Sequence, residues 1–152
     1  GLCIDRIFSE KGEKSFREME RDCLEEIIFK YENGKMQPHK DSCRHLVISL
    51  GGGTVTTSES LEKIREKTFC IYLKAGIETI LSHLKGDSSG RPLLNSEKEK
   101  TEDCDNDAIF RKSVGNLMSR RENLYDRASD AVITVDGLSP EEICSAIKGL
   151  LE

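Results

Sequence analysis

Residues 48–57 read ISLGGGTVTT: a short apolar run, three consecutive glycines, then small and β-branched residues. Three glycines in a row are unfavourable within a strand or helix, because glycine loses more backbone entropy on folding than any other residue. The stretch therefore predicts a loop in which bare backbone approaches something closely. It is not a phosphate-binding P-loop, since the 152 residues contain no G-x-x-x-x-G-K-[ST].

Helical and apolar segments alternate on both sides of this loop. Gly12 separates a short helix over 3–11 from a longer one over 13–33, in which apolar residues recur at three- and four-residue spacing. Three apolar runs predict strands that are covered on both faces: HLVISL (45–50), TFCIYLK (68–74) and AVITV (131–135). The other predicted helices are 56–67 with a Thr56–Glu59 capping box, 76–84, 108–127, and a last one with Ser139 as cap, Pro140 first and Glu142 completing the box.

This alternation predicts an α/β fold with right-handed crossovers and a parallel sheet. In such sheets ligands bind beyond the carboxyl ends of the strands. Gly51, Gly52 and Gly53 directly follow the first predicted strand, so we expect them at that edge.

The bulk composition indicates one soluble domain. The net charge of −5 argues against a broad nucleic-acid surface, and no apolar run approaches transmembrane length. With no signal peptide and no C-x-x-C among six cysteines, we expect reduced thiols and a cytoplasmic protein. His39, Cys43 and His45 are close enough to suggest a metal site, but without a fourth ligand we favour a solvated connecting loop.

Charged residues interrupt two apolar helical stripes. Glu20 lies in line with Phe16 and Ile27, and Arg17 is placed one turn earlier to pair with it. Arg121 lies within the stripe of Leu117, Leu124 and Ala128. Two interpretations stay open: structural ion pairs at the edge of the core, or two arginines that bind an anionic ligand, with Glu20 orienting Arg17.

Residues 85–107 form a polar stretch that predicts a mobile excursion or lid within the domain. Arg91 lies in its SGRPLL segment. It is either an ordinary turn arginine or a lid residue that reaches a transferring phosphoryl group.

Taken together, GEKSFREMERD, ISLGGGTVTT, GRPLL and RRENLYDRA resemble the shikimate kinases in order, spacing and context. That family shows an F-R-x-x-E helix, a strand ending in G-G-G, a lid R-P-L-L and an R-x-x-x-Y helix. The resemblance covers essentially all 152 residues. It implies transfer of the γ-phosphoryl group of ATP to the 3-hydroxyl of shikimate with Mg²⁺, a step of aromatic amino-acid biosynthesis.

The resemblance also implies a fold and roles for the residues singled out above. The fold is a three-layer αβα P-loop kinase-like domain with a parallel sheet over residues 1–152, lacking its first strand and P-loop. Arg17 and Arg121 would bind the shikimate carboxylate, with Glu20 orienting Arg17. The backbone of Gly51–Gly53 would contact substrate, and Arg91 would close over the phosphates.

The sequence departs from the family pattern mainly at its beginning. The family's first strand, Walker A loop and an aspartate-bearing segment have no counterpart here, so we expect this chain alone to be inactive and poorly stable. Leu84 and Lys85 replace an arginine often found beside adenine, and Gly137 and Leu138 replace a commonly polar neighbour of the base. Leu138 is the remaining candidate for an ATP contact.

We expect shikimate as the small-molecule partner, no nucleic acid or membrane, and a monomer when the protein is complete. Two other functions remain possible. One is a kinase-like module without catalysis that binds a small carboxylate or a protein partner. The other is a different small-molecule P-loop kinase, which a substrate panel led by gluconate would reveal.

Overall fold

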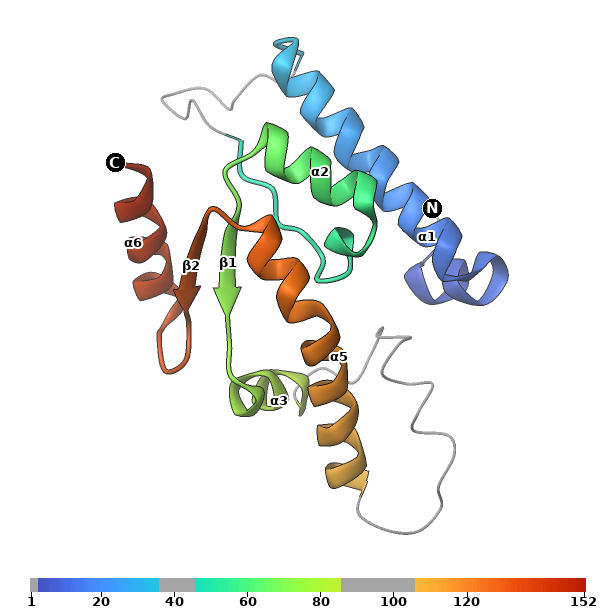
Figure 1. Ribbon diagram of the computed structural model, residues 1–152, viewed down its shortest axis with the longest axis vertical. Coiled ribbons are helices and arrows are strands. Elements are labelled where there is room, and N and C mark those ends of the chain that lie inside the picture. The colour runs from blue at the N-terminus through green and yellow to red at the C-terminus, as the bar shows by residue number, and fades with distance from the viewer. Residues whose placement is uncertain (1–2, 36–45, 86–105) are drawn as a thin grey trace.

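The computed structural model describes residues 3–35, 46–85 and 106–152. Helices predominate in them, and two strands form a small sheet (Figure 1). The elements in chain order are α1 (Ile4–Glu32), the short 3₁₀ helix η1 (Thr54–Thr56), α2 (Ser58–Lys67), β1 (Ile71–Lys74), α3 (Ile77–Lys85), α5 (Asn106–Ala128), β2 (Ala131–Thr134) and α6 (Pro140–Leu151). None of the described helices combines the length and apolar character needed to cross a bilayer.

The break predicted at Gly12 is present as a kink within α1. Gly12 has φ 79° and ψ 170°, a backbone conformation that residues other than glycine rarely adopt. Beyond the kink, Leu24 and Ile28 are buried, but Met19 and Cys23 of the same predicted stripe are exposed. The apolar face of α1 is therefore narrower than its periodicity predicts.

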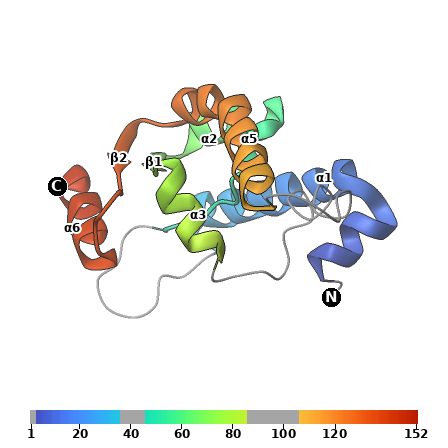
Figure 2. The same cartoon turned by 90° about the horizontal axis from the view of Figure 1, so that it is seen from below.

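The two strands run parallel, as predicted, with Ile71 opposite Ala131 and Lys74 opposite Thr134. In both views α5 lies on the β1 side of this pair and α6 on the β2 side (Figures 1 and 2). The long connection between the strands contains α3 and α5, as a parallel crossover requires.

The strand predictions need two corrections. Residues 46–50 of the predicted strand 45–50 are not a strand, and Val47 is 88% exposed; His45 lies outside the described residues. A strand needs a hydrogen-bonded neighbour, and no described strand pairs with this segment. The second and third predicted strands, 68–74 and 131–135, shorten to β1 and β2, and Leu73 and Val132 are 46% and 50% exposed rather than covered.

Helix caps were predicted with mixed success. Ser139 caps α6 as expected, because its side chain accepts from the Glu142 N–H while the Glu142 side chain accepts from the Ser139 N–H. The box predicted at Thr56 and Glu59 is wrong. Because Thr56 belongs to η1, the N-cap of α2 is Thr57 instead. The Thr57 hydroxyl donates to Ser60 Oγ at 2.9 Å.

The main core joins α1, η1, α2 and α5. Its buried members are Leu24, Ile28, Val55, Leu61, Ile64 and Ala128. Val55 follows the three glycines by two residues and is itself part of this core. Packing of η1 therefore fixes the end of the glycine loop between α1 and α5.

Candidate functional site

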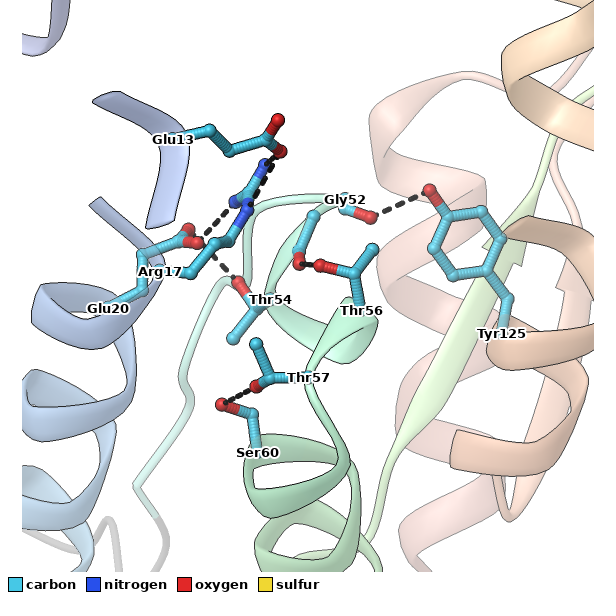
Figure 3. A network of polar contacts seen from close by, with 10 residues as sticks. Glu13, Arg17, Glu20, Gly52, Thr54, Thr56, Thr57, Ser60 and Tyr125 are labelled. Carbon is cyan, nitrogen blue, oxygen red and sulfur yellow. Dashed lines mark hydrogen bonds and ion pairs between the residues drawn. The ribbon is translucent and has the colours of Figure 1, made fainter. Parts of the chain in front are cut away.

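Residues distant in the sequence meet around the three glycines. Figure 3 shows α1 on one side of the loop and α5 on the other, with side chains from both reaching it. We call this cluster the glycine corner. Its members are Glu13, Arg17, Glu20, Gly51, Gly52, Gly53, Thr54 and Tyr125.

Arg17 is fixed by two carboxylates of its own helix. Its Nη1 donates to Glu20, the pair predicted from the helical spacing, and its Nη2 donates to Glu13 Oε1 at 3.1 Å (Figure 3). The side chain is only 11% exposed. Because each terminal nitrogen of a guanidinium carries two hydrogens, both Nη1 and Nη2 keep one N–H that has no acceptor among the described residues.

Glu20 connects the helix to the loop. While one of its oxygens accepts from Arg17, the other, Oε1, accepts from Thr54 Oγ1 at 3.2 Å (Figure 3). The carboxylate is thus paired and hydrogen-bonded, which offsets the cost of its partial burial. It ties the orientation of Arg17 to the position of the glycine loop.

Close approach by neighbouring side chains explains the three glycines. A Cβ at Gly51 would lie 3.2 Å from Glu20 Oε1, and one at Gly52 would lie 3.0 Å from the Tyr125 hydroxyl. At Gly53 it would overlap the guanidinium of Arg17. A side chain at Gly53 would therefore require the guanidinium of Arg17 to move.

The loop's acceptors and donors are used unequally. The Gly51 and Gly53 carbonyls accept from the N–H groups of Thr54 and Thr56, and the Gly52 carbonyl accepts from Tyr125 at 2.8 Å. In contrast, no described residue accepts a hydrogen bond from the N–H of any of the three glycines. The loop presents donors to a ligand, as an anionic or hydroxylated molecule would need.

Arg121 lies on α5 one turn before Tyr125, so the two side chains share a helix face. Tyr125 contacts the loop, but the structure shows no hydrogen bond or ion pair between Arg121 and any member of the glycine corner. Arg121 is half-buried and forms no ion pair with any residue that the structure describes. The guanidinium of Arg121 is thus not paired with a described carboxylate, whereas that of Arg17 is held by Glu20.

The structure assigns none of the remaining candidate residues to this cluster. Arg91 and residues 86–105 of the predicted lid lie outside the described residues, as do His39, Cys43 and His45. Within the described ranges no group of three or more His, Cys, Asp or Glu could hold a metal ion. Leu138 is described: it lies in the turn after β2, where its N–H donates to the Val135 carbonyl at 3.1 Å.

Three contributors to the glycine corner were not predicted from the sequence. Glu13 could have been found, because it lies four residues before Arg17 on the same helix. Thr54 and Tyr125 could not be assigned their contacts in this way. The Tyr125–Gly52 bond joins residues that are 73 positions apart.

Comparison with known proteins shows the family and the fold of this chain. The family model described as shikimate kinase matches residues 1–152. The chain belongs to the shikimate kinase family. A shikimate kinase of Persephonella marina is 32% identical over 149 residues, covering 98% of this chain and 74% of that protein. One of Chlorobium phaeobacteroides is 34% identical over 137 residues, covering 90% of this chain and 63% of that protein.

A solved structure gives the same answer for the fold. Shikimate kinase from Acinetobacter baumannii in complex with shikimate superimposes with a TM-score of 0.76 at 23% identity. The match covers 99% of this chain and 70% of that one. The α/β P-loop kinase-like fold class expected from the sequence is confirmed, and the relatives are kinases named for shikimate.

Proposed function

We propose that the glycine corner binds the carboxylate and ring hydroxyls of shikimate, and that this chain contributes the substrate site for ATP-dependent phosphorylation of the 3-hydroxyl. The proposal rests on the position and the hydrogen bonding of the Arg17 guanidinium. This guanidinium is oriented by Glu20, lies against Gly53 and keeps on both terminal nitrogens an N–H that no described residue accepts. That geometry suits a carboxylate, which accepts from both nitrogens of an arginine fork.

In the proposed complex Arg121 supplies a second cation to the carboxylate from α5. The free N–H groups of Gly51–Gly53 then face the substrate's oxygens. Such positioning matters because phosphoryl transfer depends mainly on orientation and charge stabilisation. Arg91 would supply charge stabilisation at the phosphates, and Leu138 an apolar contact for the base.

ATP is the proposed phosphoryl donor, and Mg²⁺ would accompany it as the usual metal of such reactions. The described residues offer no metal-binding cluster, and the printed sequence contains no Walker A motif. Because Mg²⁺ in such reactions is held mainly by the substrate phosphates with one or two carboxylates, we derive no step through the metal. The role of the described residues in this proposal is to bind and orient shikimate.

The test is a coupled assay of the natural full-length protein with ATP, Mg²⁺ and either shikimate or gluconate. We expect transfer to shikimate and none to gluconate, and no turnover by the printed 152 residues alone. Transfer to gluconate instead would favour the other P-loop kinases. Tight shikimate binding with no transfer by the full-length protein would favour a binding module without catalysis.

A further inference from the structure

Tyr125 connects α5 to the glycine loop, and it is not among the residues proposed to contact shikimate directly. Its hydroxyl donates to the Gly52 carbonyl at 2.8 Å (Figure 3). Its ring packs against Tyr72 of β1, with centroids 5.1 Å apart. The hydroxyl is thus aimed at the loop by a ring that the sheet itself supports.

A hydrogen bond to the Gly52 carbonyl does more than fix that one oxygen. The peptide bond is planar and trans, so the N–H of Gly53 points away from the carbonyl of Gly52. When Tyr125 fixes the carbonyl toward α5, it also fixes the Gly53 N–H in the opposite direction. That N–H has no acceptor among the described residues, and Gly53 is the glycine that lies against Arg17.

Without this bond little else would orient the 52–53 peptide. Glycine has an unusually wide choice of backbone angles, and residues on both sides of this peptide are glycine. The carbonyls of Gly51 and Gly53 are fixed by bonds within the turn, but the only described donor to the Gly52 carbonyl is Tyr125. A single phenol therefore decides the orientation of one donor in the site.

We propose that Tyr125 is a positioning residue that orients the Gly52–Gly53 peptide so that the Gly53 N–H binds the substrate next to Arg17. The part that concerns shikimate rests on the proposed function. Arg121, one turn earlier on the same face, supplies charge from the helix that also supplies this bond. In this proposal one face of α5 both binds the ligand, through Arg121, and orients the glycine loop, through Tyr125.

The first test compares Tyr125→Phe with Tyr72→Phe in the natural full-length protein. Both variants remove a hydroxyl from the same ring pair, but only the first removes the bond to Gly52. We expect Tyr125→Phe to raise the KM for shikimate about three- to tenfold, as for one neutral hydrogen bond, and to leave the KM for ATP unchanged. Tyr72→Phe should change neither.

Equal effects of the two variants would overturn the proposal. So would a parallel rise of both KM values with a fall in melting temperature, because general destabilisation would then explain the result. A rise in the KM for shikimate without a rise in the KM for ATP is a result that a merely structural tyrosine would not give.

A second measurement does not depend on the substrate. In ¹⁵N-labelled full-length protein, the Gly53 amide resonance should shift in Tyr125→Phe and stay in place in Tyr72→Phe. An unshifted Gly53 resonance in Tyr125→Phe would contradict the positioning role. If that resonance moves as expected but the wild type does not phosphorylate shikimate, the proposed function fails while the orientation of the loop by Tyr125 stands.

Discussion

The glycine corner and the two-stranded sheet are built very differently. In the glycine corner, the carbonyls of Gly51, Gly52 and Gly53 each accept a hydrogen bond, and Glu20 bonds both Arg17 and Thr54. In the sheet, four-residue strands pair only with each other among the described residues, and Leu73 and Val132 are about half exposed. The contrast indicates that the glycine corner is organised by contacts within this chain, while the sheet contributes less packing.

The largest expected effect comes from filling the space beside Arg17. Gly53→Ala places a Cβ where the guanidinium lies, so Arg17 must shift from the position in which Glu13 and Glu20 hold it. We expect shikimate binding to weaken by about 2–5 kcal/mol, as when a buried charge pair loses one partner. Calorimetric titration measures this.

The matched control is Gly149→Ala in α6, where an added Cβ meets nothing within 4 Å. It should leave affinity unchanged. If Gly53→Ala binds as well as this control, Arg17 is free to move and the corner is not as rigid as its contacts indicate.

The packing difference can be measured directly by urea unfolding of the full-length protein. Ile64 of α2 is 0% exposed, so Ile64→Ala should cost about 2–5 kcal/mol of stability. Leu73→Ala on β1 should cost about 1 kcal/mol or less, because half of that side chain is already in water. A cost at Leu73 as large as at Ile64 would mean that the full-length protein covers this strand.

Arg121 gives a smaller test of the same corner. Arg121→Ala removes a half-buried cation without disturbing any ion pair within the described ranges, so stability should hardly change. Shikimate affinity should fall by about 1.5–3 kcal/mol, the contribution of hydrogen bonds to a charged group. Arg120→Ala, an exposed neighbour on α5, should have no effect, and equal losses in the two variants would indicate only a general charge effect.

The smallest expected effect is on stability and concerns Asp136, two residues after the end of β2. Asp136 accepts from the Thr79 hydroxyl at 2.6 Å and the Gly76 N–H at 2.8 Å, and these bonds lower the pKa of its carboxyl below the usual value. A depressed folded-state pKa contributes stability above the unfolded pKa, and this is lost as pH falls through the folded one.

Asp136→Asn should therefore be less stable than the wild type near neutral pH, with the difference shrinking in acid. Thr79→Val, which removes the first donor, should show part of the same change. Urea unfolding at several pH values measures both. A difference that does not depend on pH would show that the ionised carboxylate of Asp136 is not the stabilising form.

Local signals predicted much of this molecule. The Gly12 break, the Ser139 cap and the Arg17–Glu20 pair depend on residues within one or two helical turns, and all are present. The strand predicted at 45–50 was wrong over its described part because an apolar run does not supply a pairing partner. The bond from Tyr125 to Gly52 depends on how α5 crosses the loop, which no local pattern encodes.

The central claim is that the oriented guanidinium of Arg17 binds the carboxylate of shikimate. The most direct measurement is calorimetric titration of shikimate into the natural full-length protein, its Arg17→Ala variant and Arg6→Ala, which removes an exposed, ion-paired arginine from the same helix. We expect unchanged affinity for Arg6→Ala and a loss of about 30-fold or more for Arg17→Ala. Equal affinity in all three proteins would contradict the claim.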